Sequence, residues 1–325
     1  MPALARLACA AAMAAVAVAA GAQPAKPPPR IGVLFPAPLS GPNNMHHFYE
    51  GLRDFGYEEG RNLVVERRFG DGTQARLDAL AFELAQQKVD VIVAWGPAST
   101  RAAPAATTTV PIVMGTFDAV DQGLIASYGR PGGNITGWSV LSSESGKKQL
   151  ALLKEAIPGI TRVAVISNPS MPGHANLMRS LDKDARTLGL TLVRTDVASA
   201  AALPEAFAAM RRSRVDAFFL LAEPTVIDPL RAQIIALAAE QRLPAIYPWR
   251  MYADAGGLMS YGPSLPDLIR RDAYFVHRIL GGARPADLPV ETPDRYELVL
   301  NLGAAKALGI TFPPSLRAFA TATID

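Results

Sequence analysis

Two hydroxyl side chains, Ser99 and Thr100, follow a segment at 89–94 that is apolar apart from Asp90. Such a segment is typical of a strand buried on both faces of a parallel sheet, and the hydroxyls would open the helix that comes next. The free N–H groups and the dipole at a helix N-terminus favour an anion such as an α-carboxylate. The same two side chains could instead cap the helix without any ligand.

Two acidic side chains occupy the corresponding place after other apolar segments. Asp118 follows the fourth predicted strand, and Glu223 follows the predicted strand at 215–221. Asp118 could accept an ammonium group, or it could cap a loop and face solvent. Glu223 is a second candidate for the ammonium partner, and the residues alone leave the choice open.

Three aromatic side chains lie at or near the ends of later extended segments, namely Tyr247, Trp249 and Tyr261. Together they could form an aromatic wall for a flat or cationic ligand. A place in the core or the hinge is the alternative for each of them. The predicted ligand site is completed by loop residues that follow other strands: Ser40, Pro97, Ala98, Phe117 and Asn168.

The short motifs of common enzymes are absent from the sequence. It has no GxGxxG between a strand and a helix, no GxxxxGK[ST], no GxSxG and no HExxH. The four histidines are scattered, and the adjacent pair His46 and His47 would point in different directions on a helix. We therefore predict no catalytic residue, no metal site and no cofactor. An enzyme is the alternative, because α/β clefts also host catalysis.

The elements that position these residues occur twice along the chain. From Ile31 the order is strand, helix ending at Gly56, strand, helix and strand, and the same order returns from Val163. The approach to the third strand also recurs, as Lys-Val-Asp at 88–90 and Arg-Val-Asp at 214–216. Duplication of a βαβαβ half predicts two similar α/β lobes with parallel sheets.

Two such lobes enclose a cleft, and in parallel sheets a ligand binds beyond the carboxyl ends of the strands. The helix and strands at the end of the chain do not fit a simple tandem pair, but they fit a chain that crosses between the lobes three times and so forms a hinge. We expect lobe 1 to comprise 23–139 and 263–289, and lobe 2 to comprise 140–262 and 290–325. The predicted class is α/β, with two Rossmann-like lobes joined by this hinge.

Composition and the N-terminal segment indicate an exported globular protein. Half of the residues are hydrophobic, the formal charge is only +3, and charges of both signs are interspersed, so nucleic acid is not an expected partner. Arg6 precedes an apolar run that ends in Ala-Gly-Ala, which predicts a signal peptide at 1–22, although a retained anchor is the alternative. The single cysteine, Cys9, lies in this segment, so the mature chain would have no disulfide. The expected oligomeric state is a monomer.

Several longer segments resemble the tryptophan/tyrosine-type substrate-binding proteins of ABC transporters, which are periplasmic binding proteins of the type I fold. The matching sequences are GLRDFGYEEGRNL at 51–63, KVDVIVAWGPAST at 88–100, PIVMGTFD at 111–118, RPGGNITGWS at 130–139, GGLMSYGPSLPDLIRR at 256–271 and the stretch 281–316. The chain differs from the usual pattern at Ala119, where the family usually has proline after the aspartate, and in the segment after the first strand.

This resemblance implies a function in ligand capture rather than catalysis. The protein would bind a small molecule, such as an aromatic or other amino acid, in the cleft and deliver it from the periplasm to the membrane permease of an ABC transporter. A sensory protein that presents the ligand to a signalling receptor would share these features and is the alternative.

Overall fold

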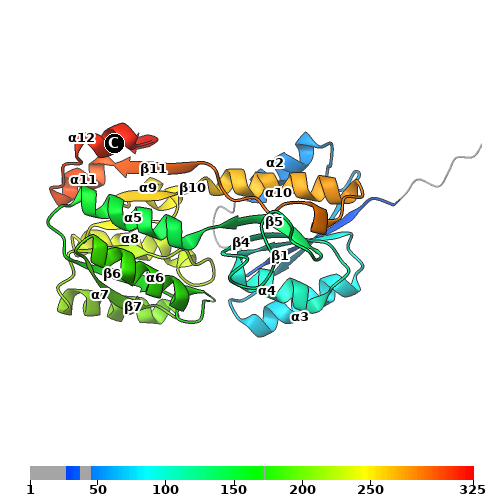
Figure 1. Cartoon of the computed structure of the whole chain (residues 1–325), viewed down its shortest axis with the longest axis horizontal. Helices are drawn as coiled ribbons and strands as arrows, with labels where there is room; N and C mark the ends of the chain where they lie inside the picture. The colour runs from blue at the N-terminus through cyan, green and yellow to red at the C-terminus, as the bar shows by residue number, and fades with distance from the viewer. Residues whose placement is uncertain (1–26, 37–44, 172) are drawn as a thin grey trace, which may run out of the picture.

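Parallel strands form the centre of each of two α/β lobes, which lie side by side in the computed structural model (Figure 1). The structure describes residues 27–36, 45–171 and 173–325. The first sheet has the order β2-β1-β3-β4-β5 and is parallel throughout. Its elements are β1 Arg30–Phe35, α2 Met45–Asp54, β2 Val64–Phe69, α3 Gln74–Gln86, β3 Val91–Trp95, α4 Gly96–Ala106, β4 Ile112–Phe117 and β5 Ile135–Val140.

The second sheet has the order β12-β11-β10-β9-β8-β6-β7. Its strands are β6 Arg162–Ser167, β7 Thr191–Asp196, β8 Ala217–Leu220, β9 Ala245–Tyr247, β10 Met259–Pro263, β11 Tyr296–Asn301 and β12 Ala322–Ile324. Its helices are α5 Ser142–Ala156, α6 His174–Thr187, α7 Leu203–Arg212, α8 Arg231–Glu240, α9 Arg250–Asp254, α11 Leu302–Leu308 and α12 Pro314–Phe319. β11 runs antiparallel to β10, because the chain enters it from the other lobe.

The duplication predicted from the sequence is visible in hydrogen bonds as well as in element order. Lys88 and Arg214 both adopt a left-handed backbone, with φ of 52° and 50°. The side chain of the aspartate two residues later then accepts a hydrogen bond from the backbone N–H of the first residue in the lobe's first strand. Asp90 accepts from Arg30 at 2.7 Å, and Asp216 accepts from Arg162 at 2.8 Å. The repeated tripeptide therefore fixes the same strand-to-strand register in both lobes.

The apolar patterns correctly identified the core. The strand β3 is buried along its whole length, as predicted for a strand covered on both faces. The helical face of α3 that was predicted from i, i+3, i+4, i+7 spacing, Leu77, Leu80, Ala81 and Leu84, is also buried. Among the described residues, no helix combines the length and the apolar character that a membrane crossing requires.

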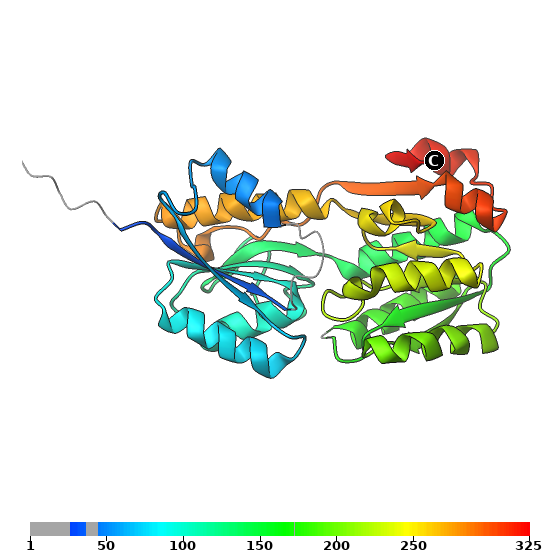
Figure 2. The same cartoon turned by 180° about the vertical axis from the view of Figure 1, so that it is seen from behind.

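The chain passes between the lobes at three places. It leaves lobe 1 between β5 and α5, returns between β10 and helix α10, Leu265–Leu280, and leaves again before β11. Figures 1 and 2 show α10 lying against α2 on lobe 1, although it follows β10 of lobe 2 in sequence. After α10 the chain follows β5, where the Ser139 N–H donates to the Glu291 carbonyl at 2.9 Å.

The sequence pattern predicts one helix from Lys147 to Ile157 and another from Leu268 to Leu280, and both begin earlier. α10 starts at Leu265 rather than Leu268, because the Ser264 hydroxyl accepts from the Asp267 N–H and caps the helix. α5 starts at Ser142 rather than Lys147, and here the cap comes from a distant residue, since the Asp118 carboxylate accepts from the Ser142 N–H at 2.9 Å. Local sequence contains no sign of this second cap.

Hydrogen bonds connect the three crossing segments to one another. On α5, the Gln149 amide donates to the Tyr261 carbonyl at 2.6 Å, and the Ser145 hydroxyl donates to the Tyr296 hydroxyl at 3.2 Å. The rings of Tyr261 and Tyr296 are stacked with their centroids 5.4 Å apart. The first turns of α5 are thus joined to the ends of both other crossings.

A buried carboxyl group lies where α10 packs on the lobe 1 sheet. Asp272 is fully buried and accepts from the Trp95 indole N–H at 2.6 Å. Burial raises the pKa of Asp272 to about 8, against the opposing effect of indole hydrogen bonding. The folded protein therefore retains a proton at Asp272 that the unfolded chain loses near its ordinary pKa of 3.8.

We expect this proton to make the folded state less stable as pH rises. Between pH 4 and pH 8 the free energy of unfolding should fall by up to about 1.4 kcal/mol per pH unit from this group alone. Asp272→Asn cannot ionise and should remove that slope, whereas Asp267→Asn, an exposed position on the same helix, should retain it. Denaturant unfolding at a series of pH values measures the slope, and identical slopes in Asp272→Asn and the parent would contradict the assignment.

Candidate functional site

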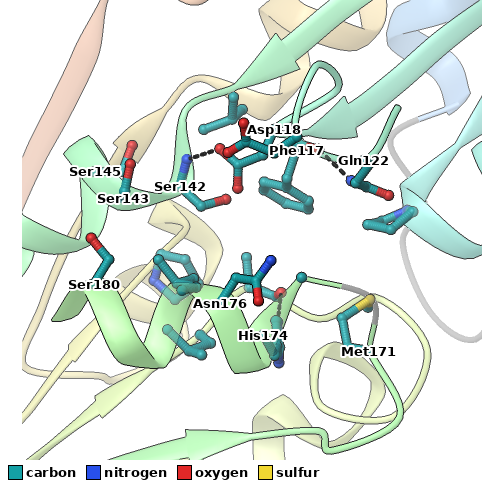
Figure 3. Close-up of a pocket in the computed structure, with 18 of the residues that line it drawn as sticks. Phe117, Asp118, Gln122, Ser142, Ser143, Ser145, Met171, His174, Asn176 and Ser180 are labelled. Atoms are coloured by element: carbon teal, nitrogen blue, oxygen red, sulfur yellow. Dashed lines mark hydrogen bonds between the residues drawn. The ribbon is translucent and has the colours of Figure 1, made fainter. Parts of the chain in front are cut away.

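A cavity of about 400 Å³ lies between the lobes and is lined by residues of both. Lobe 1 contributes Pro97, Phe117, Asp118, Asp121 and Gln122. α5 contributes Ser142, Ser143, Ser145 and Gln149, and the rest of lobe 2 contributes Met171, His174, Asn176, Ser180, Trp249 and several apolar side chains. Figure 3 shows Asp118, Phe117 and Gln122 facing Asn176 and His174 across this space. The volume is within the range of small-molecule binding pockets.

Asp118 is the acidic residue that the fold brings to the cavity wall. Its backbone has φ of 45°, an uncommon conformation for a residue with a side chain, and its N–H donates to the Val140 carbonyl at 2.9 Å. The carboxylate receives the N–H of Ser142 at the start of α5 (Figure 3). Burial raises the pKa of Asp118, Ser142 opposes this effect, and the nearby Asp121 adds to it.

The charged groups around the cavity favour a cation at the Asp118 end. Asp118 and Asp121 both line the space, and Arg101 is the lining guanidinium. Arg101, however, is exposed and donates to the Gln74 side chain at 2.6 Å. Burial lowers the pKa of His174, so this imidazole is neutral at pH 7. A positively charged ligand group near the two carboxylates would therefore offset their mutual repulsion.

One aromatic ring from each lobe borders the same cavity. Phe117, at the end of β4, and Trp249, which precedes α9, have ring centroids 6.2 Å apart and planes inclined by 41°. The apolar face that they form is continued by Met171, Leu177, Phe219 and Leu221. The cavity therefore has an acidic end and an apolar wall, as an amphipathic ligand requires.

The two hydroxyls predicted to bind an anion are buried away from the cavity. The Thr100 hydroxyl is buried and bonds with the Gly96 carbonyl at 3.0 Å and the Thr116 hydroxyl at 3.1 Å. Ser99 is buried too, its Oγ has no hydrogen-bond partner among the described residues, and neither side chain lines the cavity. Pro97 does line it, whereas the Ala98 carbonyl accepts from Gln74 on the outer side of the helix.

Glu223 is likewise used within its own loop. Its fully buried carboxylate accepts the N–H groups of Thr225, Val226 and Ile227, at 2.9, 2.7 and 2.8 Å, and also the Thr225 hydroxyl. Asn168 similarly accepts from the Ser170 N–H at 3.0 Å. Neither residue lines the cavity, and both side chains bond N–H groups of their own loops instead.

The three predicted aromatic residues separate into three environments. Trp249 lines the cavity, whereas Tyr247 is buried in the lobe 2 core, stacked on Tyr252 at 4.9 Å. Tyr261 stacks on Tyr296 between two crossing segments, which corresponds to the hinge alternative. Ser40 lies outside the described residues.

Sequence reasoning missed the serines at the start of α5 and the residues of α6 that face them. Ser142, Ser143 and Ser145 line the cavity because α5 begins at Ser142, where the Asp118 carboxylate caps it, rather than five residues later. The run of hydroxyls after β5 was the available signal. Asn176 and Ser180 had no comparable signal, because they lie on an ordinary amphipathic helix.

A comparison with known protein families identifies the chain. Residues 38–324 match the family described as ABC transporter substrate binding protein. The chain belongs to this family. The resemblance found in the sequence segments is thereby confirmed, and substrate-binding proteins of this family are usually exported and generally not enzymes.

Individual relatives agree with this assignment. A tyrosine-binding protein of Clostridioides difficile is 26% identical over 262 residues, which cover 80% of this chain and 75% of the relative. The crystal structure of a conserved domain protein from Vibrio cholerae is 28% identical with a TM-score of 0.83, over 91% of this chain and 99% of that one. A domain solved with L-Trp from Streptococcus pneumonia has the same fold, with 24% identity, a TM-score of 0.82 and coverage of 91% and 100%.

The structure of the Glu223 loop yields a stability prediction for this substrate-binding protein. Glu223→Gln replaces a carboxylate oxygen by an amide NH₂ that faces backbone donors, so the variant should lose about 1–3 kcal/mol of unfolding free energy. Urea denaturation of the variant and the parent measures the loss. An unchanged midpoint would contradict the role of Glu223 in fixing the loop.

Proposed function

We propose that this ABC transporter substrate-binding protein captures an amino acid with a flat, apolar side chain in the interlobe cavity. The observation that supports it most is a single cavity with Asp118 at one end and the Phe117–Trp249 ring pair beside it. The carboxylate suits the ammonium group, and the rings suit the side chain. The relatives named for tyrosine binding and for a complex with L-Trp support the same ligand class.

Delivery to a membrane permease completes the proposed function. The protein would be exported through the signal peptide at 1–22, act in the periplasm as a monomer, and present the closed lobes to the permease. Lobe 1 would comprise 23–139 and 263–289, and lobe 2 would comprise 140–262 and 290–325. The three crossing segments supply the hinge about which these lobes close.

The ligand class is tested by comparing an amino acid with its deaminated analogue. L-tyrosine or L-tryptophan at 100 times its dissociation constant should stabilise a chain starting at Gln23 by about 2.7 kcal/mol in a thermal-shift assay. The corresponding arylpropionate lacks the ammonium group and should give little stabilisation. Equal stabilisation by both compounds would contradict an ammonium site.

The acidic end of the cavity is tested by calorimetric titration of a variant. Asp118→Asn should weaken binding of the amino acid by at least about 2 kcal/mol, because it removes the charge that pairs with a desolvated ammonium group. Asp182→Asn on α6, which does not line the cavity, is the matched control and should bind like the parent. An amino acid that binds Asp118→Asn as tightly as the control would assign the ammonium group to another residue.

A further inference from the structure

The aromatic wall of the cavity is backed by a buried acid in lobe 2. Asp228 begins the short turn Asp228–Leu230, after the loop that Glu223 fixes, and its own N–H donates to the Glu223 carbonyl at 2.9 Å. Its carboxyl group receives the Tyr252 hydroxyl at 2.6 Å. Both ends of this loop are therefore fixed by carboxyl groups.

Tyr252 connects this acid to the cavity. It is fully buried on α9, and its N–H donates to the Trp249 carbonyl at 3.0 Å. Trp249 is the residue that precedes α9 and lines the cavity. Tyr252 is therefore joined through the first turn of α9 to the residue that carries the cavity indole.

The surroundings of Asp228 agree with a contact to both aromatic residues. Burial raises the pKa of Asp228 to about 7, with a further contribution from Glu223, while Tyr252, Arg231 and hydrogen bonding from the Trp249 side chain oppose the shift. The Arg231 guanidinium lies over the Tyr252 ring at 6.0 Å from its centroid. A buried carboxyl group is costly unless it is hydrogen-bonded, and at Asp228 the Tyr252 hydroxyl supplies that bond.

We propose that Asp228 and Tyr252 are positioning residues for ligand recognition, a hydrogen-bonded pair that fixes the Trp249 indole in the cavity wall. Asp228 does not line the cavity, so it acts on the ligand only through Trp249. The inference rests on the proposed function for the identity of the ligand, but the position of Trp249 can be measured without any ligand.

Tyr247 provides a control for the loss of a tyrosine hydroxyl next to the Asp228–Tyr252 pair. Tyr247 stacks on Tyr252 at 4.9 Å, and it is buried to the same degree. Its hydroxyl makes no hydrogen bond to the part of the chain that the structure describes. Tyr247→Phe therefore changes the same aromatic stack without touching the Asp228 pair.

The direct test uses ¹⁹F NMR of protein labelled with 5-fluorotryptophan. The sequence has three tryptophans, so three resonances are expected, and the one missing from Trp249→Phe belongs to Trp249. In the absence of ligand, Tyr252→Phe and Asp228→Leu should shift and broaden this resonance. Asp228→Asn retains an acceptor for Tyr252 and should leave it near its parent position, as should Tyr247→Phe.

Affinity for L-tyrosine, measured by calorimetry, should follow the same pattern. We expect at least a tenfold loss in Tyr252→Phe and Asp228→Leu, and less than a threefold change in Asp228→Asn and Tyr247→Phe. A Trp249 resonance that is the same in Tyr252→Phe as in Tyr247→Phe would overturn the proposal. If L-tyrosine does not bind the parent, the proposed ligand is wrong, and the ligand-free spectra still decide the role of Asp228.

A titration of the parent protein tests the pair even where a variant does not fold. The Trp249 resonance should move with a midpoint near pH 7 in the parent and should not move in Asp228→Asn. The groups that act on Asp228 are Glu223, Arg231, Tyr252 and Trp249, and all of them are retained in that variant. A titration that persists in Asp228→Asn would mean that another group acts on Trp249, and the proposal would fail.

Discussion

The hydrogen bond from the Ser142 N–H to the Asp118 carboxylate connects the two halves of the molecule. It joins the residue that follows β4 of lobe 1 to the first residue of α5, the helix that begins the chain's course through lobe 2. The early start of α5 brings Ser143 and Ser145 to the cavity wall, while Gln149 on the same helix binds the second crossing segment. The same carboxylate gives the cavity its acidic end, so one side chain links the hinge, the cavity wall and the charge of the site.

Buried acids paired with aromatic donors stand behind the site in both lobes. Trp95 donates to Asp272 in lobe 1, and Tyr252 donates to Asp228 in lobe 2. Each acid lies on an element next to a crossing or a cavity loop, and burial raises the pKa of both. An apolar residue at either position would stabilise the core at least as well, so these pairs are better explained by the geometry that they impose on the neighbouring loops.

The sequence predicted the elements better than the orientation of side chains. The buried strands and their order along the chain follow from the apolar patterns and the repeated tripeptides. Pro97, Phe117, Asp118 and Trp249 lie at or shortly after strand ends, and all four line the cavity. Glu223 also lies shortly after a strand end, but its carboxylate turns back to the N–H groups of its own turn. Tyr247 ends its strand among core residues of lobe 2, and the start of α5 depends on a residue 24 positions away. The start of α5 and the burial of Tyr247 depend on tertiary contacts that the local sequence does not encode, whereas Glu223 has a local alternative that its residue type alone does not decide.

The account depends on closure of the two lobes around a ligand at Asp118. Double electron–electron resonance can measure it directly, because a chain starting at Gln23 has no cysteine and two can be introduced at exposed positions, Ala79 on α3 and Lys183 on α6. These helices belong to opposite lobes on the same side of the molecule (Figure 1). We predict that a saturating amino acid shortens and narrows the distance distribution in the parent and has much less effect in Asp118→Asn at equal occupancy. An unchanged distribution in the parent, with binding established by calorimetry, would contradict the account.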